Sequence, residues 1–247
     1  GRTTASLSAE VRPQVGGIIQ KRLFTEGDMV KAGQALYQID PSSYRATWNE
    51  AAAALKQAQA LVVSDCQKAQ RYASLVRDNG VSRQDADDAA SACAQDKASV
   101  ESKKAALESA RINLNWTTVT APIAGRIGIS SVTPGALVSA DQDTALATIR
   151  GLDTMYVDLT RSSVDLLRLR RQSLASNSDT LSVTLTLEDG STYPEKGRLA
   201  LTEVAVDEST GSVTLRAIFP NPQHVLLPGM FVRARIDEGI MNDAILA

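Results

Sequence analysis

Apolar residues recur between residues 44 and 76 at alternating steps of four and three. The series is Tyr44, Trp48, Ala51, Leu55, Ala58, Val62, Asp65, Ala69, Tyr72 and Val76, and all but Asp65 are apolar. Residues at this spacing form one stripe along an α-helix, which is the seam of a coiled coil. The pattern therefore predicts a long helix that packs lengthwise against a partner.

A second helix is predicted after the break at residues 78–80, because Ala86, Cys93, Val100, Leu107 and Leu114 recur at steps of seven. Two helices joined by a short turn run antiparallel, and each would reach about 50 Å. Folding about the turn places the seam residues level in pairs: Tyr44 with Leu114, Ala51 with Leu107, Ala58 with Val100, Asp65 with Cys93 and Tyr72 with Ala86. Two separate amphipathic helices on a globular core, the alternative, would not require this agreement.

The turn between the two helices carries its own signals. Gly80 suits the position just after a helix end, where a left-handed backbone is common. Ser82 and Asp85 resemble a capping box at the start of the second helix. The sequence thus predicts an α-helical coiled-coil hairpin over residues 41–114.

The segments on either side of these helices resemble each other. Gly17 and Gly125 precede Gly27 and Gly135 by the same number of residues, and residues 35–39 match residues 145–149. Short alternating apolar runs with Gly and Pro indicate small β-elements with tight turns. We expect residues 9–40 and 115–150 to be two half-motifs of one β-domain into which the helices are inserted.

Alternating patterns after residue 151 predict antiparallel strands. The runs are 155–160, 181–187, 198–206, 213–219 and 231–236, with a helical run at 162–174 and hairpin turns at 189–190 and 208–211. Together with residues 1–8, residues 151–240 are predicted to form a small β-barrel with one helix. Residues 241–247 read as the start of a truncated further domain. The expected fold class is mixed α and β, elongated and multidomain.

Composition narrows the function classes. The net charge of -2 supplies no field for phosphate backbones, so a nucleic-acid partner is not expected. No string typical of a catalytic, metal-binding or nucleotide-binding site occurs, so neither enzymatic activity nor a cofactor is predicted. The single histidine, His224, lies in a Pro-rich loop. It is read either as an exposed loop residue or as a residue sensitive to mildly acidic pH.

A family resemblance rests on several strings. Residues 26–36, EGDMVKAGQAL, resemble the half-motifs of biotinyl and lipoyl carrier domains, here split by the helices. The combination is similar to the AcrA/MexA-type periplasmic adaptors, or membrane fusion proteins, of resistance-nodulation-division efflux pumps. Further strings that carry this resemblance are residues 9–15, 37–41, 110–114, 219–222 and 226–231.

The resemblance implies a tripartite assembly. An adaptor of this family bridges an inner-membrane resistance-nodulation-division drug/proton antiporter to a TolC-like outer-membrane channel. It self-associates as a trimer or hexamer ring in the periplasm, and it is attached to the inner membrane through an N-terminal lipid that would lie outside this chain. The split β-domain would be lipoyl-like.

Three tip residues follow from the same resemblance. In the family an Arg, a Leu four residues later and a Ser seven residues beyond contact the channel, and Arg71, Leu75 and Ser82 have this spacing. The alternatives are that Leu75 closes the coil, that Ser82 is only a helix cap and that Arg71 is solvated. Arg77 and Asp78 differ from the uncharged residues common in the family, which leaves the choice of channel open.

Cys66 and Cys93 lie almost level in the register of the two helices. They are either a disulfide across the hairpin or two small seam hydrophobes. The oxidising periplasm that the resemblance implies favours the disulfide.

Two other functions are compatible with parts of the sequence. A carrier protein would present a modified lysine between its half-motifs, where this chain has the hairpin. The adaptor of another tripartite exporter, for metal efflux or protein secretion, would favour Met or His clusters or a longer coil, and neither pattern is present.

Overall fold

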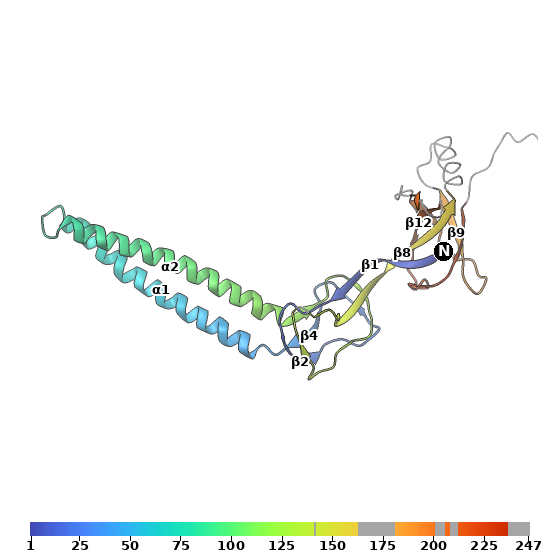
Figure 1. Cartoon of the computed structure of the whole chain (residues 1–247), viewed down its shortest axis with the longest axis horizontal. Helices are drawn as coiled ribbons and strands as arrows, with labels where there is room; N and C mark the ends of the chain where they lie inside the picture. Colours follow the sequence, from blue (N-terminus) through green and yellow to red (C-terminus); the bar gives the residue numbers. More distant parts are fainter. Residues whose placement is uncertain (141, 163–180, 201–205, 208–211, 237–247) are drawn as a thin grey trace, which may run out of the picture.

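The computed structural model describes residues 1–140, 142–162, 181–200, 206–207 and 212–236. The described chain is elongated, with a helix pair at one end, a first β-lobe in the middle and a second β-lobe at the other end (Figure 1). It is therefore a mixed α and β fold, as predicted.

The helix pair consists of α1 (Ser42–Leu75) and α2 (Arg83–Trp116), which lie side by side and run in opposite directions (Figure 1). All ten seam positions predicted in the first helix are buried or half-buried, and Ala58 is 6% exposed. The buried residues of α2 are Ala89, Cys93 and Ala110. Small side chains thus dominate the contact, which lets the helices approach closely while burying little apolar area per residue.

The first β-lobe lies at the base of the helix pair (Figure 1). One sheet contains β5 (Thr118–Thr120), β4 (Ala35–Ile39), β2 (Gly17–Arg22) and β7 (Leu137–Val138), in that order. Facing elements are β3 (Met29–Val30), β6 (Gly125–Ile127) and the first part of β8 (Ala147–Ser162). Tyr37 lies in the core between them, and its hydroxyl contacts Ser130 Oγ at 2.7 Å and donates to the Leu146 carbonyl at 3.1 Å.

The two half-motifs adopt matching backbones. Gly17 and Gly125 both have φ of 155°, and Gly27 and Gly135 have φ of 86° and 94°. A residue with a side chain is strained at a φ near 90°, because its Cβ clashes with the backbone. The turns after β2 and β6 therefore both require glycine. Equal spacing in the sequence therefore corresponds to equal geometry in the two halves.

The second β-lobe is an antiparallel sheet. Its order is β13 (Arg233–Ile236), β9 (Ser182–Thr186), β10 (Gly197–Ala200), β12 (Ser212–Pro220) and β8, while β11 (Val206–Asp207) pairs with β12. Backbone hydrogen bonds join residues 1–3 to residues 230–232, so the sheet curves back toward its first strand. The core holds Met155, Leu185, Leu215 and Phe219, each no more than 1% exposed.

Two strands continue from one β-lobe into the other. β1 (Arg2–Val11) pairs antiparallel with β8 along almost its whole length, and the register shifts between Ala5 and Leu7, opposite Gly151. The sequence predicted separate strands at residues 145–149 and 155–160, whereas β8 continues through Gly151 without a break. Glycine there permits close packing, because a Cβ at Gly151 would lie 3.3 Å from the Leu7 Cβ, but it does not end the strand.

Some predictions fall outside the described residues. The helical run after Ser162, the turn at 208–211 and the segment 241–247 cannot be compared with the structure. Ser162 itself is the last residue of β8.

Candidate functional site

The free end of the helix pair is a seven-residue turn between α1 and α2. Asn79 has φ of 55°, and the Gly80 N–H donates to the Leu75 carbonyl at 2.9 Å. The left-handed position is therefore occupied by Asn79, and the prediction that Gly80 takes it was wrong. Asparagine tolerates this conformation better than other residues with a side chain, so the turn closes without glycine there.

Ser82 begins the second helix as its N-cap. Its Oγ accepts a hydrogen bond from the Asp85 N–H at 3.1 Å and donates to Asp85 Oδ2 at 2.6 Å. The predicted cap is confirmed, with the reciprocal bond made to the Asp85 side chain. The hydroxyl group is exposed at the end of the helix pair.

Arg71 and Leu75 lie one turn apart on α1, and both are exposed. Leu75 is 41% exposed, so it does not close the seam. Within the part of the chain that the structure describes, the Arg71 guanidinium has no hydrogen-bond or ion-pair partner. The end of the pair thus presents a free cation, an uncovered apolar side chain and a hydroxyl.

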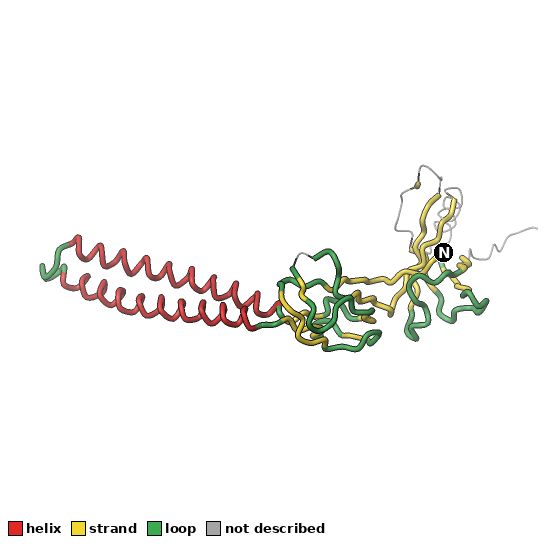
Figure 2. The backbone as a smooth tube through the Cα atoms, turned by 60° about the horizontal axis from the view of Figure 1, so that its bottom comes forward, coloured by secondary structure: helices red, strands yellow, loops and turns green. Residues whose placement is uncertain are grey.

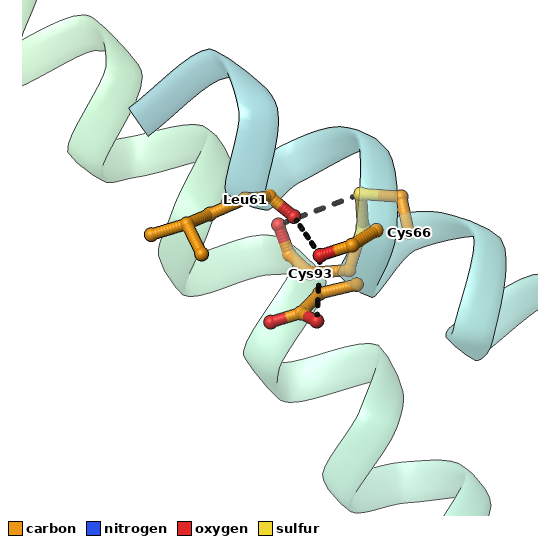
Figure 3. Close-up of a disulfide and its surroundings, with 5 residues drawn as sticks. Leu61, Cys66 and Cys93 are labelled. Atoms are coloured by element: carbon orange, nitrogen blue, oxygen red, sulfur yellow. Dashed lines mark hydrogen bonds between the residues drawn. A yellow bond between two sulfur atoms is a disulfide. The ribbon is translucent and has the colours of Figure 1, made fainter. Parts of the chain in front are cut away.

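A disulfide between Cys66 and Cys93 crosses the helix pair below this end (Figure 3). The Cα atoms are 4.7 Å apart, and 27 residues separate the cysteines in the sequence. Arg71, Leu75 and Ser82 all lie inside the covalent loop that the bond closes. Helix axes normally pack 8–10 Å apart, so small neighbouring residues are needed for this approach.

Two carboxyl groups meet beside the disulfide. Burial raises the pKa of Asp96, and the neighbouring carboxyl group of Asp65 raises it further. Asp96 Oδ2 is buried without a hydrogen-bond partner. Asp65 is the one polar residue of the seam predicted in the first helix, whereas Asp96 lies off the steps of seven in α2 and is not marked by the sequence pattern.

Replacing Asp96 with Asn is expected to raise the melting temperature of the helix pair at pH 7. A carboxyl whose pKa is raised by folding contributes stability below its ordinary pKa of about 3.9 and loses it as pH rises through the folded pKa. The gain should therefore shrink toward pH 4. Thermal unfolding followed by circular dichroism at pH 7 and at pH 4 measures the change in melting temperature at each pH, with the exposed Asp87→Asn as control. An equal shift at both pH values would show that the carboxyl pair is not the cause.

His224 lies far from this end, in the loop before β13. Its Nε2 is 3.1 Å from Asp153 Oδ1, and its φ is 54°. The Asp153 side chain is 87% exposed, so the contact lies at the surface.

The described residues contain no group of three or more His, Cys, Asp or Glu side chains placed to hold a metal ion. Among them there is also no helix whose length and apolar character would let it cross a membrane.

Two family models match the chain. Residues 7–150 match the barrel-sandwich hybrid domain of RND membrane fusion proteins, and residues 154–240 match their β-barrel domain. The chain belongs to the RND membrane fusion protein family.

Curated relatives of this membrane fusion protein are efflux proteins. It is 54% identical to the multidrug export protein AcrE of Escherichia coli K12 over 250 residues, covering all of this chain and 65% of AcrE. It is 54% identical to the multidrug resistance protein MexA of Pseudomonas aeruginosa over 253 residues, covering all of this chain and 62% of MexA. It is 51% identical to the multidrug efflux pump subunit AcrA of E. coli K12, and it covers 63% of AcrA. The membrane fusion protein chain thus spans less than two thirds of these relatives.

Solved structures share the fold. The membrane fusion protein Spr0693 of Streptococcus pneumoniae R6 superposes with a TM-score of 0.72 at 18% identity, covering 97% of this chain and 98% of Spr0693. A MacA-MexA chimera that contains the α-hairpin domain of P. aeruginosa MexA superposes with a TM-score of 0.62 at 30% identity, covering 96% of this chain and 78% of the chimera. The arrangement of helices and strands is therefore that of membrane fusion proteins.

Proposed function

We propose that the protein carrying this chain is the non-enzymatic periplasmic adaptor of a tripartite multidrug efflux pump. It bridges an inner-membrane RND transporter to a TolC-like outer-membrane channel. The observation that carries the proposal is the free end of the helix pair, where Arg71 and Leu75 are exposed and the Arg71 guanidinium has no partner among the described residues. The 51–54% identity to multidrug efflux subunits supports it and does not favour metal or protein export.

The finer architecture is part of this proposal. The helix pair is a coiled-coil hairpin, residues 9–40 and 115–150 form a lipoyl-like domain, and residues 1–8 and 151–240 form a β-barrel. The two long helices support the first assignment. The paired glycine geometry of the two half-motifs and the family match over residues 7–150 support the second. The family match over residues 154–240 supports the third.

The partners of the adaptor belong to the same proposal. Copies of the adaptor stand side by side as a trimer or hexamer ring in the assembled pump, attached to the inner membrane through a lipidated N-terminus. In this arrangement Arg71, Leu75 and Ser82 contact the channel. Leu75 would then be covered, and the Arg71 guanidinium would gain a carbonyl or carboxylate acceptor.

Deleting the gene that encodes this chain should lower the inhibitory concentrations of several chemically unrelated drugs. The physical reason is that drug leaving the transporter has no sealed path across the periplasm without the adaptor. Growth in drug dilution series measures the effect, and restoring the gene should reverse it. Unchanged susceptibility, in a strain where no second adaptor is expressed, would contradict the proposed function.

A further inference from the structure

A cavity of about 400 Å³ lies where the two β-lobes meet. The first β-lobe contributes Glu26 and Arg126, β8 contributes Arg150 and Leu152, and the loop before β13 contributes Leu227 and Pro228. The volume falls in the range of small-molecule sites. The two lobes are joined beside it by β1 and β8, which form the ribbon between them (Figure 2).

Two arginines lie side by side in the lining of this cavity. Arg126 of β6 and Arg150 of β8 are directly opposite in an antiparallel pair, so their side chains project from the same face of the sheet. The next pair, Ile127 and Ile149, is buried in the core, which places both arginines on the outer face. Like charges directly opposite each other destabilise a sheet unless an anion lies between them.

The charges of the two arginines are not balanced within the chain. Arg126 Nε donates to the Gly27 carbonyl at 2.8 Å, a neutral acceptor. In the ranges that the structure describes, the Arg150 guanidinium has no hydrogen-bond or ion-pair partner. The carboxylate of Glu26, which also lines the cavity, is already paired with Arg22 and accepts from the Ser130 N–H at 3.2 Å. The cavity therefore keeps a net positive charge.

Apolar side chains lie next to the guanidinium groups. Ile129 is 81% exposed and Leu227 is 43% exposed, although both line the cavity. Leu152, two residues beyond Arg150 on β8, also lines the cavity. It is 2% exposed and closes the cavity toward the core of the second β-lobe.

The loop on the opposite wall is fixed in place. The buried amide of Asn221 donates to the carbonyls of Leu152 and Leu226 at 2.8 and 2.9 Å. Its Oδ1 accepts from the Leu226 N–H at 3.1 Å. Leu227 and Pro228 follow directly, so the apolar wall is held at the end of a satisfied hydrogen-bond network.

We propose that this cavity binds a small amphipathic carboxylate of the medium-chain fatty-acid type. The carboxylate lies between Arg126 and Arg150, and the apolar chain covers Ile129 and Leu227. Guanidinium groups bind carboxylates through paired, charge-assisted hydrogen bonds, and an apolar chain gains from leaving water. A ligand in this position contacts both β-lobes and holds them at one angle. This inference does not depend on the proposed function.

Isothermal titration calorimetry of the 247-residue chain with decanoate, below its critical micelle concentration, tests the proposal. One decanoate is expected to bind per chain, more tightly than decanol or inorganic phosphate. Arg150→Gln should weaken binding about ten-fold or more, since a hydrogen bond to a charged group contributes about 1.5–3 kcal/mol. Arg150→Lys, which keeps the charge and loses the forked geometry, should give a smaller loss. Arg235→Gln, at an exposed arginine of β13 outside the cavity, should bind as the wild type does.

Ile129→Ser tests the contact with the apolar chain of the ligand separately from the contact with its carboxylate. It should weaken decanoate binding and leave phosphate binding unchanged. Phosphate binding as tight as decanoate, or decanol binding as tight as decanoate, would overturn the amphipathic assignment. An absence of binding, or binding that Arg150→Gln does not change, would overturn the site. Self-association that is lost in Arg150→Gln without any decanoate would show that a second copy of the chain occupies the cavity instead. Circular dichroism melts establish that each variant is folded.

Discussion

Arg71→Asp in the protein that carries this chain is expected to abolish drug resistance while expression and folding stay normal. The guanidinium is exposed and has no partner among the described residues, so its replacement removes nothing that stabilises the chain. Surface substitutions of this kind usually change stability by less than about 0.5 kcal/mol. At a docked interface the same change places a negative charge where a positive one was bound, and reversing one partner of a buried pair costs several kcal/mol.

Arg45→Asp is the matched control. Arg45 is an exposed arginine on the same helix, α1, near its base and far from the turn. Resistance should survive this change, because the charge reversal is the same and only the position differs. Growth in drug dilution series and immunoblots of the envelope fraction measure activity and protein level. Full resistance in Arg71→Asp at a normal protein level would contradict the proposal that the free end of the helix pair contacts the channel.

Replacing Cys66 and Cys93 with Ala is expected to destabilise the end of the helix pair by about 3.5 kcal/mol on the chain-entropy model, and by less if the reduced chain keeps helical structure. Apolar packing between the helices contributes little stability at this end of the pair, so it does not offset the loss of the disulfide. Between the cysteines, the only helical residue that the structure buries is Ala89. The Asp65 and Asp96 carboxyls beside the bond repel each other when both are ionised.

Hydrogen exchange locates this effect. Backbone amides of residues 67–92 should exchange faster in the double variant and in reduced wild-type protein, whereas the two β-lobes should exchange as before. The existence of the bond in cells is measured separately by thiol labelling of unfolded, unreduced protein from the periplasm. Two reactive thiols per chain would show that the disulfide does not form there.

Local patterns in the sequence were sufficient to predict much of the fold. The seam residues of the first helix are identified by their spacing, and all of them are shielded in the structure. The spacing of Gly17 and Gly27 matches that of Gly125 and Gly135, and the backbone angles match as well. Such features are readable because each depends on residues close together in the chain.

Features that depend on distant residues were not predicted. Gly151 looks like a boundary in the sequence, but pairing with β1 carries β8 through it. The left-handed position of the turn falls on Asn79 rather than on Gly80, because the end of α1 sets the register of the turn. Asp96 meets Asp65, and Arg126 meets Arg150, only after helices and strands have paired.

Photo-cross-linking from position 75 tests the central claim most directly. A photoreactive amino acid in place of Leu75 would be compared in living cells with the same residue in place of Ile112, an exposed apolar position near the base of α2. The adaptor account predicts that position 75 forms an adduct with a TolC-like outer-membrane channel and that position 112 does not. Absence of a channel adduct at position 75, in cells whose pump confers resistance, would contradict the account.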